Sequence, residues 1–160
     1  MVRGLATGRE QRPVLSESVQ RDLQEDCGIM MLSDVRDYVE SLGISENVYM
    51  GKLPDKPEKS IGVYNSKHQR AYHTAIGGSH LEGYGEKPVT ILVHWNRSPR
   101  DTEKAATELF EKLRAARNTE INNETIKFIQ PLYEIQGVGT DDAGIYEMVI
   151  EVAVIYEKKE

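Results

Sequence analysis

The sequence predicts an α+β domain in which two principal helices pack on a mainly antiparallel β-sheet with a long C-terminal β-hairpin. Apolar residues recur at helical spacing over residues 32–42 and 99–116, which indicates two amphipathic helices. Apolar residues occupy alternate positions over residues 89–95 and 146–157, which indicates strands. The elements do not alternate strand, helix, strand, and no segment repeats, so neither a parallel α/β sheet nor a repeat architecture is expected.

Length and composition favour one globular domain with some peripheral tail. The chain has 160 residues, of which 39% are hydrophobic and 29% charged. No apolar run approaches the roughly 20 residues of a membrane helix, and the first residues lack the apolar middle of a signal peptide. We therefore expect a soluble, intracellular protein. The net charge is −6 with acids and bases interleaved, which argues against a surface that grips nucleic acid.

Residues 1–30 are expected to form an N-terminal extension to a domain of residues 31–160. The first 15 residues have no hydrophobic periodicity, which predicts a partly flexible arm. Ser16 is a good N-cap, and a short helix interrupted by Gly28 is predicted after it. The single cysteine, Cys27, excludes an internal disulfide and a thiolate zinc cluster, and is expected to be an inert small apolar residue.

The first principal helix is expected to end at Gly43, and two short strands are expected after it. The apolar face of this helix holds Leu32, Val35, Val39 and Leu42. Residues 48–53 and 61–65 have strand character, and residues 54–59 between them form a charged turn with two prolines. Residues 66–86 are rich in glycine, tyrosine and histidine and have little apolar periodicity. They predict a long excursion, because loops of that length in compact domains are usually functional or disordered.

The strand of residues 89–95 is expected to place His94 and Trp95 on opposite faces of the sheet. Ser98, Pro99 and Asp101 then predict the start of the second helix, with an acidic capping box formed by the serine and the aspartate. The buried face of this helix is expected to hold Ala105, Ala106, Leu109, Phe110, Leu113 and Ala116.

Two long strands are predicted at the C-terminus, joined by the glycine-rich loop GVGTDDAG of residues 137–144. The first strand covers residues 124–136, where Pro131 requires a bulge or a sheet edge. The second strand, residues 145–157, has one continuous apolar face, which is expected to be core. Its other face alternates glutamates with apolar residues.

No motif for catalysis, metal binding or cofactor binding is present in the sequence. His73 and His80 lack metal-ligand spacing and are best explained as solvated loop histidines. Adjacent Ser79 and His80 do not ordinarily place a hydroxyl and an imidazole for proton transfer. Residues 137–144 lack the calcium-loop pattern and the remaining Rossmann glycine, so a tight turn is expected there. We predict a protein that is not an enzyme and holds no cofactor or metal.

Taken in order, these segments resemble the tail terminators of long-tailed phages, which are minor capsid proteins. The resemblance covers about residues 31–158 and depends on the combination and order of its motifs. The matching segments are MLSDVRDYVESLGI, VYMGKLPDKPEKSIGVYN, AIGG, YGEKPVTILVHWNRSPRDTEKAATELFEKL and GVGTDDAGIYEMVIEVAVIYEKK.

The resemblance implies a virion protein that is assembled in the host cytoplasm. Its copies would form a homohexameric ring that caps the completed tail tube, ends tube polymerisation and joins the tail to the head connector. The expected partners are therefore further copies of the chain, the tail tube protein and a head connector or neck protein. DNA would pass through the lumen without specific binding. The alternatives are a head-completion or neck adaptor protein and, further off, a small enzyme or ligand-binding domain that uses His73, His80 or His94.

A cyclic ring needs two different complementary surfaces on each subunit. Aromatic anchors and permissive glycines in the excursion suit one such surface, although the same residues could close over their own core. The interface candidates are Tyr72, His73, Ile76, Gly77, Gly78 and Tyr84, the corner residues Arg97 and Arg100, and the loop residues Asp141 and Asp142. Glu147, Glu151 and Glu157 are predicted to face the lumen or the tube, with ordinary solvent contact as the alternative.

Overall fold

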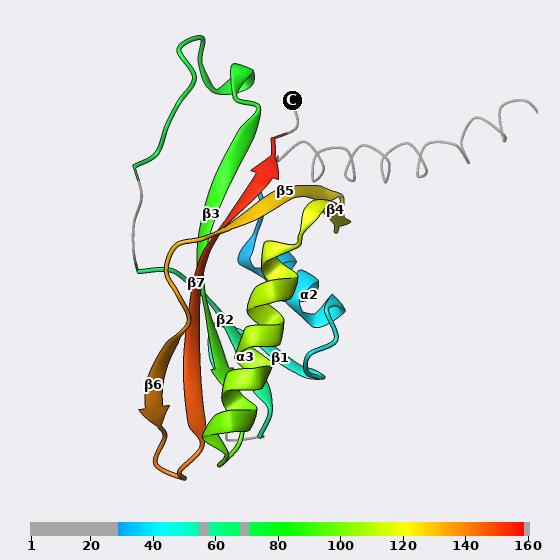
Figure 1. Ribbon diagram of the computed structural model, residues 1–160. Helices are drawn as coiled ribbons and strands as arrows, with labels where there is room; N and C mark the ends of the chain where they lie inside the picture. Colours follow the sequence, from blue (N-terminus) through cyan, green and yellow to red (C-terminus); the bar gives the residue numbers. More distant parts are fainter. Residues whose placement is uncertain (1–28, 55–57, 68–70, 159–160) are drawn as a thin grey trace, which may run out of the picture.

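The computed structural model describes residues 29–54, 58–67 and 71–158. Within them, two helices, α2 (Leu32–Ser41) and α3 (Pro99–Arg114), lie on one face of a seven-stranded sheet (Figure 1). Buried apolar residues of both helices and of the sheet belong to a single cluster. The α+β prediction is confirmed. The predicted extension up to Gly28, including Cys27, lies outside the described residues.

The sheet is antiparallel except at one edge. Its order is β1 (Asn47–Met50), β2 (Ser60–Asn65), β3 (Tyr84–His94), β7 (Tyr146–Glu157), β5 (Glu124–Pro131) and β4 (Arg117–Ile121), and β6 (Gln136–Thr140) also pairs with β7. The pairing of β1 with β2 is parallel. The long strands β3 and β7 pair from Tyr84 opposite Glu157 to His94 opposite Glu147 and form the centre of the sheet.

Helix α3 begins and packs as its sequence predicts. Ser98 is the N-cap, its hydroxyl accepts from the amide of Asp101 at 3.3 Å, and the predicted apolar face is buried. The predicted reciprocal half of the capping box is wrong. The amide of Ser98 donates instead to the side chain of Asn96 at 2.9 Å, and the carboxylate of Asp101 accepts from the Asn96 amide group at 3.4 Å. Asn96 therefore connects the end of β3 to the start of α3.

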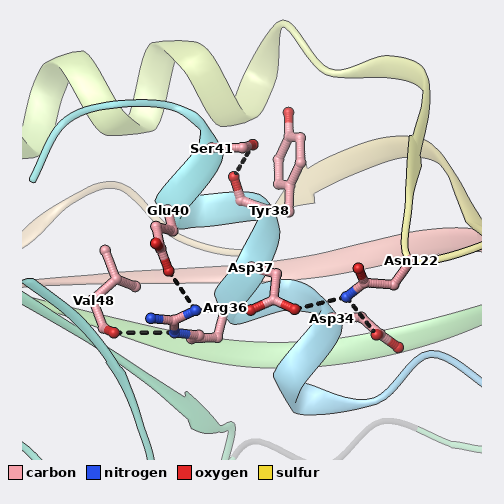
Figure 2. A network of polar contacts seen from close by, with 8 residues as sticks. All are labelled: Asp34, Arg36, Asp37, Tyr38, Glu40, Ser41, Val48 and Asn122. Atoms are coloured by element: carbon pink, nitrogen blue, oxygen red, sulfur yellow. Dashed lines mark hydrogen bonds and ion pairs between the residues drawn. The ribbon is translucent and has the colours of Figure 1, made fainter. Parts of the chain in front are cut away.

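Helix α2 is tied to two separate parts of the sheet by polar contacts (Figure 2). Arg36 donates from Nε to the carbonyl of Val48 in β1 at 3.0 Å. Asn122, from the turn between β4 and β5, donates to Asp34 at 3.1 Å and to Asp37 at 2.7 Å. The bonds from Arg36 and Asn122 lower the pKa of Asp37. These contacts set the position of α2, whose apolar face packs into the core.

The strand of residues 84–94 is longer than predicted because its partner imposes the extension. Residues 84–88 have weak strand character, but each pairs with a residue of β7 between Ala153 and Glu157. Gly85 lies opposite Tyr156, and a Cβ at Gly85 would come within 2.5 Å of the tyrosine ring. The excursion is correspondingly shorter. It contains only one 3₁₀ turn, η1 (Ser79–Leu81), among its described residues.

The C-terminal hairpin is present but differs from the prediction in its first strand. That strand is divided into β5 and β6 by residues 132–135, and β5 ends at Pro131, which cannot donate to the ladder. Residues 137–140 of the predicted loop belong to β6, so the turn is confined to residues 141–144. Strand β4 was not predicted. Its turn into β5 places Asn122 and Asn123 at φ 50° and 65°, a conformation that suits a two-residue hairpin.

The middle of β7 is buried on both faces. Ile150, Val152 and Val154 belong to the predicted core face and are fully buried. On the opposite face, Ala153 is also fully buried and Glu151 is 7% exposed. The predicted core face is therefore confirmed, and the other face is not a simple solvent-facing surface. No helix in the described part of the chain is long and apolar enough to cross a bilayer.

Candidate assembly surfaces

The excursion and the first residue of β3 carry four large exposed apolar side chains. Figure 1 shows the excursion at one end of the β3–β7 pair. Tyr72 is 77% exposed and Ile76 is fully exposed. Leu81 and Tyr84 are also exposed. The chain turns at residues 75–78, where the amide of Gly78 donates to the carbonyl of Ala75 at 2.9 Å and Gly78 has φ 103°. Exposed apolar clusters of this kind mark contact surfaces in soluble proteins.

Lys158, which follows β7, holds the excursion in place. Its Nζ forms an ion pair with Glu82 and donates to the hydroxyl of Tyr72 at 2.9 Å. The same ammonium lies 5.1 Å from the centre of the Tyr72 ring. The bond with Lys158 lowers the pKa of Glu82, and the bond with Glu82 raises the pKa of Lys158. Each group stabilises the charged form of the other, so the contact persists across neutral pH.

A groove of about 640 Å³ lies between the excursion and the ends of β3 and β7. Its lining combines aromatic and polar side chains, including Tyr72, Leu81, Tyr84, Lys87 and Tyr156. Ile29 and Met30, the first described residues, also line it. Tyr72, Leu81 and Tyr84 line the groove and are also exposed large apolar side chains.

His94 is 5% exposed and lies between two carboxylates at the opposite end of β3. Its Nδ1 is 3.2 Å from Glu147 and its Nε2 is 3.7 Å from Asp141. Asp141 also accepts from the amides of Ala143 and Ile145, each at 2.9 Å, which closes the turn between β6 and β7. Trp95 packs against the core instead, which confirms that the two neighbours point apart. His94 therefore connects β3 to the turn between β6 and β7 and to β7 itself.

No cluster of three or more His, Cys, Asp or Glu side chains suited to a metal ion occurs among the described residues. His73 and His80 are exposed in the excursion, at the other end of the β3–β7 pair from His94 (Figure 1). The histidines of the excursion and the histidine of β3 therefore do not form one site.

A family model described as bacteriophage tail terminator protein matches residues 24–158. The chain belongs to this tail terminator family. The match confirms the resemblance noted in the sequence and identifies a structural component of a phage tail, and hence of the virion. A search of curated proteins gives no match. The matched range includes both the excursion and the C-terminal hairpin.

The three glutamates that were assigned to the tube or lumen of this tail terminator lie in different environments. Glu147 contacts His94, whereas Glu157 is half exposed and lies 3.7 Å from Lys127. Glu151 accepts from Ser66 at 2.9 Å and from Thr90 at 2.7 Å. In the single chain, the glutamates do not form a row of equal exposure, because Ser66, directly after β2, and Thr90 in β3 supply hydroxyl donors to Glu151. Their orientation toward a lumen stays a prediction.

The remaining interface candidates of the tail terminator lie at the end opposite the excursion. Arg97 and Arg100 are exposed where β3 leads into α3. Asp142 is exposed in the turn between β6 and β7, whereas Asp141 is partly buried by its own turn. Two further candidates, Gly77 and Gly78, lie instead in the turn of the excursion. The contacts that these residues make with other proteins stay predictions.

Two features of this tail terminator were missed in the sequence. The contact between Glu82 and Lys158 joins residues 76 positions apart, and no local pattern indicates such a pair. Residues 137–140 of the exposed strand β6 are predicted as loop, because two of these four residues are glycines. The pairing of β6 with β7 becomes evident only from the register of the ladder.

Proposed function

We propose that copies of the chain form a homohexameric ring that caps the completed tail tube, ends its polymerisation and joins the tail to the head connector. The observation that carries the proposal is the tail terminator match over residues 24–158. The match covers all of the described residues, so the proposal concerns the domain itself and not a peripheral segment.

The distribution of exposed residues supports a ring. The excursion presents Tyr72, Ile76 and Tyr84 at one end of the β3–β7 pair, and the opposite end presents Arg97, Arg100 and the turn with Asp142 (Figure 1). These surfaces differ in chemistry, one aromatic and one charged. Cyclic assemblies are built from contacts between two different patches of the same subunit.

The net charge supports a lumen through which DNA moves without being held. A chain with a net charge of −6 repels phosphate on average. Tight phosphate contacts would retain the DNA, since each Lys or Arg contact adds to a salt-dependent affinity. We propose that the tail tube protein and a head connector or neck protein bind the two faces of the ring.

Electron microscopy of tails assembled with and without the protein tests the proposal. We expect density for a ring at the head-proximal end of complete tails and tubes of uncontrolled length in its absence. Light scattering on the protein released from tails is expected to give the mass of a hexamer. Tubes of normal length without the protein, with its density inside the portal neck, would instead support a head-completion or neck adaptor role.

A further inference from the structure

The edges of the sheet differ in how they are protected against pairing with another chain. An exposed edge strand presents unpaired backbone donors and acceptors, and proteins commonly block such edges with charges, irregular backbone or covering groups. Strands β1, β4 and β6 each have a side on which no described strand pairs.

The edge at β1 is covered by an arginine from α2. Nε of Arg36 donates to the carbonyl of Val48, which occupies an acceptor of this strand (Figure 2). The guanidinium is held in place by Asp37 at 2.8 Å and by Glu40. A strand that paired with β1 would have to displace this group.

The edge at β4 is charged and irregular. Its five residues include Arg117 and Glu120, and Asn118 has φ 45°, which interrupts the extended backbone. Both features disfavour an added strand.

The edge at β6 shares an irregular backbone with β4 but carries no charge. A β-bulge lies between Gly137 and Gly139, and Gly139 has φ 89°. Gln136–Thr140 contains no charged residue and no proline, and all five residues are exposed. Its inner side pairs with residues 146–149 of β7, and no described strand pairs with its outer side. Val138, in the middle of the strand, is 51% exposed. An uncharged, exposed edge is the kind of surface to which an extended peptide adds as a further strand.

We propose that β6 binds residues 71–74 of a second copy of this chain as an added strand. Residues 71–74 have no Asp, Glu, Lys or Arg and belong to no helix or strand. Figure 1 shows them as an open stretch of chain leading to the turn that begins at Ala75. The contact of Tyr72 with Lys158 holds the segment by a side chain. The next residue, Ala75, is excluded from the segment because its backbone is bonded to Glu82 and to Gly78.

The segment that adds and the strand β6 that receives it must come from two different molecules. The excursion lies at one end of the β3–β7 pair and β6 lies toward the other (Figure 1). Each copy would therefore offer its segment to one neighbour and accept a segment from the other neighbour. Such a heterologous contact closes into a ring if the rotation between copies permits. The inference rests on the proposed ring and specifies the contact that builds it.

Cysteine trapping on assembled tails tests this contact directly. In a Cys27→Ser background, the double variant His73→Cys, Val138→Cys is expected to give a ladder of disulfide-linked copies that ends at the ring size. Each single variant is the matched control and should give no ladder. Disulfide-linked dimers of the Val138→Cys variant alone would indicate pairing of β6 with β6, and an adduct with the tube protein would indicate a different occupant. Either result, or the absence of any ladder, overturns the inference.

A pair of lysine substitutions provides an independent test. Val138→Lys places a charge on the uncharged edge at β6, whereas Met50→Lys places one on the edge at β1, which Arg36 covers. The two positions have the same exposure, 51% against 50%. We expect at least a tenfold loss in the fraction of tails capped by Val138→Lys and no loss with Met50→Lys, with both variants folded by circular dichroism. Equal capping by the two variants overturns the inference. The proposed ring survives that result as long as the unmodified chain still controls tail length.

Discussion

The centre of the sheet and the excursion are held in place by different forces. In the centre, β3 and β7 pair along the whole of β3, and side chains such as Ile91 and Ile150 are fully buried. In the excursion, Tyr72 and Ile76 are exposed, and the side chains of Tyr72 and Glu82 both contact Lys158. The burial of apolar surface contributes a large, non-directional stabilisation that is shared by many side chains. A single ion pair contributes locally and can be removed without affecting the rest of the domain.

The difference separates stability from assembly. A side chain in the centre contributes to the free energy of unfolding of the whole domain. A side chain in the excursion is available to another molecule. A neighbouring protein that covers these side chains would explain why apolar surface is exposed there in the single chain. Substitutions matched between the two regions can therefore test whether the separation is real.

The largest effect on stability is expected for Leu109→Ala. Leu109 in α3 is fully buried, and its truncation removes apolar contacts and leaves a cavity. We expect a loss of about 2–5 kcal/mol in the free energy of unfolding, measured by urea denaturation. The matched substitution in the excursion, Leu81→Ala, removes an exposed side chain and should change this free energy by about 0.5 kcal/mol or less. Similar losses for both variants would contradict the comparison.

A smaller effect is expected for Thr90→Val on the other face of the sheet. Thr90 donates to Glu151 at 2.7 Å, and valine keeps the shape but removes the donor. A buried carboxylate that loses a partner should cost about 1–3 kcal/mol in the free energy of unfolding. Thr107→Val on the exposed face of α3 is the control and should have little effect. Equal stability of the two variants would show that the hydroxyl of Thr90 does not support Glu151.

The contact of Lys158 with Glu82 should affect the excursion alone. Lys158→Met is expected to raise amide hydrogen exchange in residues 71–83 several-fold and to leave α3 unchanged. The lowered pKa of Glu82 means that its contribution is present above the ordinary value of 4.5 and is lost as pH falls through the depressed value. The raised pKa of Lys158 means that its contribution is present below the ordinary value of 10.5 and is lost as pH rises further.

Exchange measured as a function of pH provides the control for that prediction. After correction for the intrinsic pH dependence of exchange, the unmodified chain should be protected in the excursion between these two limits and should lose protection in acid. Lys158→Met should show no such acid transition. An acid transition of equal size in the variant would mean that another group holds the excursion.

Hydrophobic periodicity predicts those helices and strands that bury the same face along their whole length. Helix α3 and strand β7 have an unbroken apolar face, and both were predicted nearly to their ends. Residues 84–88 and strand β6 were missed because proline and glycine weaken the local signal there. Pairing with β7 supplies the missing stabilisation, and that pairing depends on residues far away in the sequence.

The candidate surfaces were predictable only in part. The composition of the excursion indicated a functional loop, and its aromatic residues are indeed exposed. The position of Glu151 could not be inferred, because alternation places it on the polar face while Ser66 and Thr90 draw its carboxylate into the structure. The capping role of Asn96 was missed for a similar reason, since its side chain replaces a bond assigned to Asp101.

The smallest effect on stability is expected for Lys127→Ala. Lys127 lies 3.7 Å from Glu157 and both side chains are nearly half exposed, so solvent screens the pair. The free energy of unfolding should fall by about 0.5 kcal/mol or less, close to the change for Glu103→Ala on α3. If Glu157 faces the tube, Glu157→Gln should reduce the fraction of capped tails while the unfolding curve stays the same. If Glu157→Gln lowers the free energy of unfolding and still caps tails normally, Glu157 contributes to the stability of the domain and not to assembly.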